Sequence, residues 1–358
     1  MKPLILIGGL IILASFIIVG WYQNFREDRS PGEGIVADSD DTSIEQKSKA
    51  SQGSIQKSIF IPYWNIPEKS DDLSEYDELY YFGIAPDETG EMIDDSGFMN
   101  LDRFVESTSI DKTRLLTVRM LNTGINSSIL QDSKAQDRLI SQTLRLVEEH
   151  DLDGMVLDLE MGVIPFDNVT SQITSFVTRF SGKAEEADAL FFMTIYGDTF
   201  YRQRPYDIEK LEPRVDRFLV MAYDFHKSRG EPGPNFPFDR QSLGDGGFTY
   251  DFKTMINDFT SVTPAEKLTI LFGMYGYDWT LGPQGLPLKS ARAIPLNEID
   301  TEGAITDKNS QEKHILYTDD QGYKHVLWYE DEDSVDIKIE YLKEQGIGSV
   351  GYWVWGYF

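Results

Sequence analysis

The chain of 358 residues contains no cysteine and only four histidines. The missing cysteines exclude disulfide bonds, thiolate nucleophiles and every zinc or iron–sulfur site built on sulfur ligands. The histidines are His150, His226, His314 and His325. No two of them have the close spacing of a metal-binding pair on one helix. We therefore expect neither a metal nor a cofactor.

Basic residues are also scarce. Lysine and arginine together number 33 against 60 acidic residues, which gives a formal net charge of −27. A polyanion would be repelled by such a chain rather than bound through the release of counterions. The charge balance therefore argues against nucleic acid as a partner.

Apolar residues, by contrast, are plentiful. They make up 41% of the chain, and aromatic residues make up 13%, which is enough for a large core and argues against general disorder. The length fits one barrel-sized domain with an appendage as well as it fits two average domains.

The amino terminus carries a long apolar run. Residues 4–20 are uninterrupted by charge and are just long enough to span a membrane, and aromatic residues of the kind found at membrane interfaces follow directly. We expect residues 1–22 to be an uncleaved single-pass membrane anchor. Residues 23–57 are polar and poor in apolar side chains, so we expect a flexible linker. The remaining domain would then be extracellular, or secreted if the first segment is a cleaved signal peptide.

From residue 58 onward, short apolar runs alternate with helical patterns. Such nearly continuous runs are typical of strands buried on both faces of a parallel sheet. The expected strands are residues 58–62, 79–84, 114–118, 154–159, 190–194, 217–222, 268–273 and 349–353. The clearest helical patterns lie at residues 133–149 and 168–187. A strand–helix unit repeated eight times predicts an α/β fold, a (β/α)8 TIM barrel over residues 58–358 with reactive residues at the carboxyl ends of its strands.

One connection is too long for a barrel loop. The segment at about residues 280–329 lies between the last two expected strands and contains strand-like pieces of its own, at residues 314–318 and 325–329. We expect a small α+β subdomain inserted between strands seven and eight of the barrel.

Acidic residues that could act in catalysis lie in and around the fourth expected strand. The sequence of residues 151–160 is Asp-Leu-Asp-Gly-Met-Val-Leu-Asp-Leu-Glu. Because side chains alternate along a strand, Val156, Asp158 and Glu160 should all point into the barrel. Two carboxyl groups held together at the carboxyl end cannot both ionise freely, so one should retain a proton near neutral pH. A retained proton is what a general acid requires.

Two other interpretations fit part of this segment. The carboxylates could belong to a solvated acidic loop, although such loops rarely embed acids in an apolar strand. Glu149, Asp151, Asp153 and Glu160 also follow the spacing of a calcium-binding helix-loop-helix loop. That motif requires a helix after the loop, whereas a glycine and a proline occur within residues 161–165.

The segment resembles the signature of glycoside hydrolase family 18, the chitinases and their relatives, which reads Asp-Gly-x-Asp-x-Asp-x-Glu at the end of the fourth barrel strand. Asp153, Gly154, Asp158 and Glu160 match it, whereas Val156 stands where the family usually has the first aspartate of the inner pair.

Three further stretches agree with the family: Met-Ala-Tyr-Asp at residues 221–224, Tyr-Gly-Tyr-Asp-Trp at 275–279 and Gly-Tyr-Trp at 351–353. The expected insertion ends at residues 326–331 and is similar to a small domain of many members, especially those of spore-forming bacteria that act on peptidoglycan. The resemblance covers residues 58–358.

The resemblance implies a retaining glycosidase in which the substrate's own acetamide oxygen is the nucleophile. Glu160 would donate a proton to the leaving oxygen and later activate water. Asp158 would orient the acetamide N–H, and the hydroxyl of Tyr223 would hold the acetamide carbonyl. Asp153 would brace the end of the strand.

Four more residues would bind the sugar. The resemblance makes Trp353 the floor under the reacting ring, Tyr63 part of the opposite wall, and Asp224 and Tyr275 contacts to the bound glycan. Tyr223 and Trp353 could instead simply fill the top layer of the barrel.

The implied substrate is a glycan containing N-acetylglucosamine, cleaved at its β-1,4 bonds, with chitin and peptidoglycan both eligible. A lectin-like, catalytically weakened protein of the cell envelope is the alternative, although the presence of Glu160 argues against it because lectin-like relatives often lose that acid. A membrane-tethered assembly factor is a third class. Val156 cannot share a proton with Asp158, so we expect slower turnover or a shifted acid limb of the pH–activity profile.

Overall fold

The computed structural model describes residues 54–162, 167–240 and 248–358. The expected membrane anchor and nearly all of the expected linker lie outside these ranges. Within them, no helix is both long enough and apolar enough to cross a membrane.

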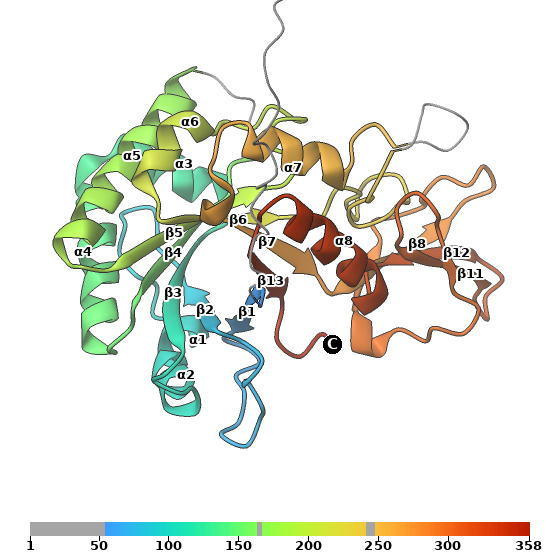
Figure 1. Cartoon of the computed structure of the whole chain (residues 1–358), viewed down its shortest axis with the longest axis horizontal. Helices are drawn as coiled ribbons and strands as arrows, with labels where there is room; N and C mark the ends of the chain where they lie inside the picture. Colours follow the sequence, from blue (N-terminus) through green and yellow to red (C-terminus); the bar gives the residue numbers. More distant parts are fainter. Residues whose placement is uncertain (1–53, 163–166, 241–247) are drawn as a thin grey trace, which may run out of the picture. The chain divides into compact units, whose positions relative to one another are not determined.

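Eight parallel strands close into a barrel in the order β1-β13-β7-β6-β5-β4-β3-β2 (Figure 1). They are β1 (Gln56–Pro62), β2 (Glu78–Ile84), β3 (Thr113–Met120), β4 (Gly154–Leu159), β5 (Leu190–Tyr196), β6 (Arg217–Met221), β7 (Leu268–Gly273) and β13 (Ser349–Trp353). Each matches a strand expected from the sequence to within two residues at either end. β2, β4 and β7 are buried at every position, as strands covered on both faces should be. The predicted barrel is confirmed.

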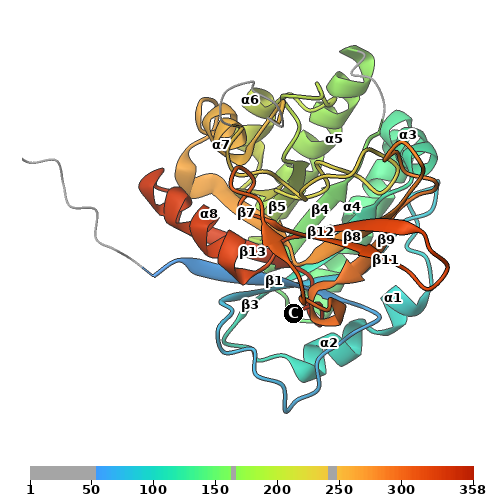
Figure 2. The ribbon, with the colours of Figure 1, turned by 90° about the vertical axis from the view of Figure 1, so that its right-hand side faces the viewer.

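Helices cover the outside of the barrel (Figures 1 and 2). They are α1 (Ser96–Met99), α2 (Leu101–Ser107), α3 (Thr123–Gln131), α4 (Ser133–Glu149), α5 (Asp167–Glu186), α6 (Ile208–Leu211), α7 (Phe252–Thr260) and α8 (Glu332–Glu344). α4 begins after Asp132, whose side chain accepts a hydrogen bond from the N–H of Lys134 and so caps the helix. Strands and helices alternate less regularly than predicted, because the polar connection between β1 and β2 contains no helix.

The interior of the barrel is filled by its own layer of apolar side chains, separate from the larger core between strands and helices. Val156 belongs to this inner layer and is completely buried with Phe60, Tyr80 and Leu219. A carboxylate at this position would lie in an apolar environment, which explains why valine packs well here.

The insertion between β7 and β13 is a five-stranded antiparallel sheet in the order β10-β11-β12-β8-β9. Its strands are β8 (Tyr275–Leu281), β9 (Arg292–Pro295), β10 (Ile305–Thr306), β11 (Lys313–Thr318) and β12 (Lys324–Tyr329). The expected α+β character is wrong, because the only helical piece in residues 275–329, all of which the structure describes, is the short 3-10 turn Leu296–Glu298. The sheet also begins before residue 280. It has its own small core, which includes Ile294, Ile315, Leu327 and Tyr329.

A buried ion cluster ties the insertion to the barrel. Lys338 of α8, with no exposed surface, pairs with Glu330 and, at 3.1 Å, with Glu312, both of which are also fully buried. The two oxygens of Glu312 accept the backbone N–H groups of Asn235 and Phe236, at 2.5 and 2.7 Å. The cluster therefore links the insertion, α8 and the loop that follows β6.

Candidate active site

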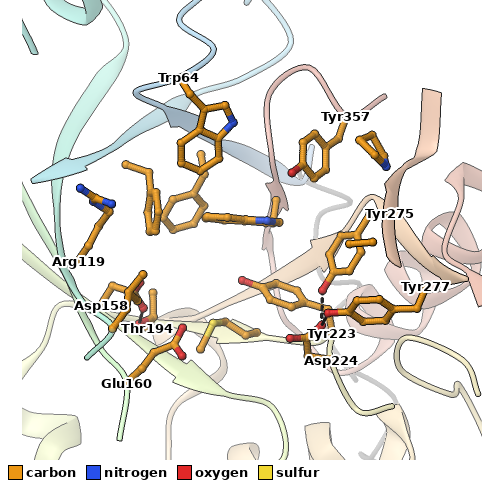
Figure 3. A pocket seen from close by; sticks show the side chains of 17 residues that line it. Trp64, Arg119, Asp158, Glu160, Thr194, Tyr223, Asp224, Tyr275, Tyr277 and Tyr357 are labelled. Atoms are coloured by element: carbon orange, nitrogen blue, oxygen red, sulfur yellow. Dashed lines mark hydrogen bonds between the residues drawn. The ribbon is translucent and has the colours of Figure 1, made fainter. Parts of the chain in front are cut away.

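A cleft of about 430 Å³ opens at the carboxyl ends of the barrel strands. Aromatic rings make up much of its wall, and three carboxyl groups face it (Figure 3). The acids are Asp158, Glu160 and Asp224. The strand ends of a closed parallel barrel are where such folds gather reactive side chains.

Asp158 and Glu160 emerge side by side from the end of β4, as the alternation of the strand predicts. Asp158 is buried, and its Oδ1 accepts a hydrogen bond of 2.5 Å from the hydroxyl of Thr194 on β5. Glu160 is half-buried, and its Oε2 accepts a hydrogen bond of 2.7 Å from the hydroxyl of Tyr196, also on β5. Each carboxyl group is thus held by a hydroxyl group of β5 and lines the cleft.

The ionisation of Asp158 is opposed by its surroundings. Burial raises the pKa of Asp158 to about 7, and the negative charge of Glu160 adds to the effect. The hydrogen bond from Thr194 and the positive charge of Arg119 act in the other direction. The sequence predicted that one acid of the pair would hold a proton near neutral pH, and the raised pKa falls on Asp158.

Tyr223 projects from the end of β6. It lies between the pair Asp158 and Glu160 on one side and Asp224 on the other (Figure 3). Burial raises the pKa of Tyr223 well above its ordinary value, with the charges of Asp158 and Glu160 adding to the shift. The phenol therefore stays protonated and able to donate a hydrogen bond into the cleft.

Asp224 is held from the insertion. Its Oδ1 accepts hydrogen bonds from the hydroxyls of Tyr275, at 2.5 Å, and Tyr277, at 2.8 Å, both on β8. Its backbone, at a φ of 59°, donates an N–H to the side chain of Asn235 at 2.7 Å. The inserted sheet therefore supplies part of the wall of the cleft and fixes one of its acids.

Trp353, at the end of β13, forms an apolar part of the cleft. Its ring meets that of Phe82 edge-on at 4.7 Å between centroids and lies 5.5 Å from the ring of Phe60. A ring supported in this way offers a flat face to the C–H side of a sugar.

Two predicted site residues do not line the cleft. The next residue after Tyr63, Trp64, lines it instead and is 51% exposed, whereas the ring of Tyr63 packs beneath the guanidinium of Arg119 at 4.8 Å. Asp153 lies at the opposite end of β4 from Glu160, where its Oδ2 accepts the N–H of Arg114 at 2.7 Å and links β3 to β4.

The residues of this region that the sequence analysis missed include Trp64, Arg119, Thr194, Tyr196 and Tyr277. Arg119 is in register with Asp158 on the neighbouring strand β3. Thr194 and Tyr196 share the inward face of β5 with buried Phe192. Strand alternation could have found the residues on β3 and β5, once the strand ends were known.

The calcium-loop interpretation is wrong. Residues Gly154–Leu159 form a buried barrel strand, and Asp153 and Glu160 lie at its two ends, so they cannot surround one ion. Among the described residues, no group of three or more histidines, aspartates and glutamates is arranged to hold a metal.

Comparison with known proteins adds a family match. The model of the glycosyl hydrolases family 18 matches residues 58–357. The cortical fragment-lytic enzyme of Bacillus anthracis is 26% identical over 236 residues, which cover 64% of this chain and 52% of that protein. The chain thus spans about half the length of the first curated relatives it matches.

Solved structures share the fold. The spore cortex-lytic enzyme SleL of Bacillus cereus superposes with a TM-score of 0.66 at 21% identity, covering 85% of this chain and 72% of that one. Human YKL-39, described as a pseudo-chitinase with retained chitooligosaccharide binding, gives 0.72 at 16% identity, covering 84% and 92%. The same barrel thus occurs in a lytic enzyme and in a pseudo-chitinase, so the side chains of the cleft must carry the functional argument.

Proposed function

Because the chain belongs to glycosyl hydrolase family 18, we propose that it is a retaining glycosidase that cleaves β-1,4 bonds of glycans containing N-acetylglucosamine. The observation that carries the proposal is the pair Asp158 and Glu160, which faces an aromatic cleft beside the hydroxyl of Tyr223. The acetamide of the bound sugar would be the nucleophile, so no second enzyme carboxylate has to attack.

Glu160 is the proposed general acid and base. It is the half-buried member of the pair, and its Oε2 is held by the hydroxyl of Tyr196. Its other oxygen has no hydrogen bond to the described part of the protein and is free to protonate the departing glycosidic oxygen. The same group would then take a proton from water as the cyclised acetamide is opened.

Asp158 and Tyr223 are the proposed partners of the acetamide. Asp158 would accept the acetamide N–H and stabilise the positive charge that develops as the ring closes, which requires the carboxylate form. The protonated hydroxyl of Tyr223 would donate to the acetamide oxygen and orient it for attack. Arg119 and Thr194 oppose the burial and the charge of Glu160 that raise the pKa of Asp158 to about 7, so they favour the carboxylate that this role requires.

The remaining cleft residues would hold the glycan. Trp353 offers an apolar face to the reacting sugar, and the fixed carboxylate of Asp224 offers an acceptor for sugar hydroxyls. Tyr275 acts chiefly through Asp224, since its hydroxyl donates to that carboxylate. Asp153 has a bracing role away from the cleft, and Tyr63 supports Arg119.

Val156 is expected to slow the reaction. The apolar side chain of Val156 cannot share a proton with Asp158 during the catalytic cycle. The hydroxyl of Thr194 gives Asp158 a hydrogen bond but does not take over the sharing of a proton. This substitution is the observation that favours the second candidate function, a lectin-like protein that binds the glycan without cleaving it.

The test is hydrolysis of chitooligosaccharides and of purified peptidoglycan, with products identified by mass. We expect Glu160→Gln to lower kcat by about 10²- to 10⁴-fold while glycan binding persists. Glu340→Gln, which changes an exposed acid of α8, is the matched control and should retain the parental rate. Equal turnover by the parent and Glu160→Gln would refute the proposal, and stable binding without product in the parent would favour the lectin.

A further inference from the structure

Arg119 is the only basic side chain that lines the cleft within the described part of the chain. It projects from β3 in register with Asp158 on β4, so it stands beside the proposed reaction centre (Figure 3). A protein with a net charge of −27 has few positive groups to place, and this one lies inside the substrate cleft.

The guanidinium is held firmly but is only partly used. Its Nη2 donates to the carbonyl of Gly83 at 2.7 Å and to Asp95 at 3.3 Å, and the group lies over the ring of Tyr63. Its side chain is 12% exposed. The Nε atom is buried and has no hydrogen-bond partner. Nη1, in contrast, makes no hydrogen bond to the described residues and is not among the buried atoms. Arginine presents donors in a planar fork suited to carboxylates, so a fixed guanidinium with this free edge is prepared for a planar anion.

Arg119 also stands at a boundary in the cleft. A second hollow of about 150 Å³ lies beside the first, and Arg119 and Leu121 line both. The second hollow is bounded by apolar side chains that include Ile93 and Ile125. A glycan that extends from one hollow into the other would pass the guanidinium.

We propose that Arg119 binds a carboxylate carried by the glycan, and that the preferred substrate is therefore an N-acetylated glycan with acidic sugars, such as those bearing the lactyl ether of N-acetylmuramic acid. This inference rests on the proposed function and selects an acidic glycan over neutral chitin. An anionic polymer approaching this acidic protein meets overall repulsion, so a local cation is needed where the acidic sugar binds. A neutral sugar has no group that requires one.

Binding to the inactive protein tests the inference. The protein is the full chain with Glu160→Gln, and the ligands are a peptide-free tetrasaccharide of alternating N-acetylglucosamine and N-acetylmuramic acid and chitotetraose. By calorimetry, we expect Arg119→Gln to weaken binding of the acidic tetrasaccharide roughly 10- to 100-fold more than it weakens binding of chitotetraose, because the effect of Arg119 on Asp158 is common to both ligands. Arg119→Lys should recover only part of the loss, since a lysine keeps the charge without the fork.

A change in the ligand provides a control that does not disturb the protein. Converting the lactyl carboxylates to methyl esters should cause the same 10- to 100-fold loss with the Glu160→Gln protein alone. Arg145→Gln, on the exposed face of α4, should change neither affinity. Equal losses for the acidic and neutral ligands, or no effect of esterification, would overturn the inference and leave Arg119 a role in positioning Asp158.

Two further results separate this inference from the proposed function. A hyaluronan tetrasaccharide, whose carboxylate is on the ring, shows which acidic sugar Arg119 binds. Binding of hyaluronan that depends on Arg119 supports a general preference for carboxylates. If the parental protein cleaves no glycan but binds the acidic one through Arg119, the glycosidase proposal fails and the binding inference stands. If the parental protein cleaves both glycans and shows no preference that depends on Arg119, the glycosidase proposal stands and the binding inference fails.

Discussion

At the scale of single residues, the cleft depends on how neighbouring side chains set the charge of one carboxyl group. Asp158 is buried beside Glu160, while Thr194 and Arg119 favour its ionised form. A carboxyl group in such a position is costly for the folded protein once it is ionised. The carboxylate that the proposed mechanism requires at Asp158 therefore carries a cost in stability.

The first prediction concerns this cost. In the unfolded chain Asp158 releases its proton near its ordinary pKa of 3.8, whereas in the folded protein its pKa is about 7. Between these values the folded form binds the additional proton, so the contribution of Asp158 to stability falls as the pH rises from about 4 to 7. Asp158→Asn has no such dependence.

Thermal unfolding at several pH values checks this prediction. The Tm of Asp158→Asn relative to the parent should be higher at pH 8 than at pH 4.5. Thr194→Val provides a second reading, because loss of the hydroxyl raises the pKa of Asp158 further and widens the pH range of the decline. A Tm difference between Asp158→Asn and the parent that does not vary with pH would contradict the assignment.

The second prediction concerns Tyr196, which donates to Glu160 at 2.7 Å. Tyr196→Phe keeps the ring and removes only the hydrogen bond that orients the proposed general acid. We expect kcat to fall about tenfold, the value of one ordinary hydrogen bond of about 1 kcal/mol or somewhat more, with KM nearly unchanged. Steady-state kinetics measures both, and a rise in KM with constant kcat would assign Tyr196 to glycan binding instead.

At the scale of elements, the inserted sheet is part of the active-site wall as well as an addition to the barrel. β8 supplies the two tyrosines that hold Asp224, and Glu312 next to β11 holds the loop whose Asn235 receives the N–H of Asp224. Lys338 of α8 neutralises part of the buried charge of this arrangement. The insertion therefore positions Asp224 through two independent sets of hydrogen bonds.

The third prediction tests the buried cluster. Lys338→Met leaves Glu312 and Glu330 buried without their cation, which should destabilise the protein by about 3–5 kcal/mol. Lys343→Met, on the same helix, removes only an exposed pair with Glu340 and should cost no more than about 0.5 kcal/mol. Unfolding by urea gives both values, and similar values for the two variants would show that the cluster contributes little.

At the scale of the whole molecule, residues 53–358 form one compact unit. We propose that residues 1–22 anchor the protein in the cell membrane and that the barrel acts outside the cell, as the apolar run at residues 4–20 indicates. A glycan of the cell envelope would then lie within reach of the cleft.

The fourth prediction follows from this arrangement. The full chain should remain in the membrane fraction through washes with high salt and alkali, and a chain starting at residue 54 should be soluble and should retain the glycan-binding activity of the full chain. Fractionation combined with amino-terminal sequencing distinguishes the cases. A full-length chain in the soluble fraction contradicts the anchor, and a shortened amino terminus in the medium identifies a cleaved signal segment.

The sequence alone was enough to predict the barrel, because strands buried on both faces leave apolar runs that can be recognised without knowing their neighbours. It also determined that Asp158 and Glu160 share one face, since alternation is a local property of a strand. Val156 was placed inside the barrel by the same rule, and the structure shows it there.

Which residues meet across strands could not be predicted from the sequence and is known from the folded structure. The partnership of Asp158 with Thr194 and Arg119 depends on the register of three strands, and the hold of β8 on Asp224 depends on how the insertion folds back. The pairing of the strands of the insertion and the exchange of Trp64 for Tyr63 in the wall have the same origin. Pairings between distant segments are set by packing and register, and no local pattern in the sequence records them.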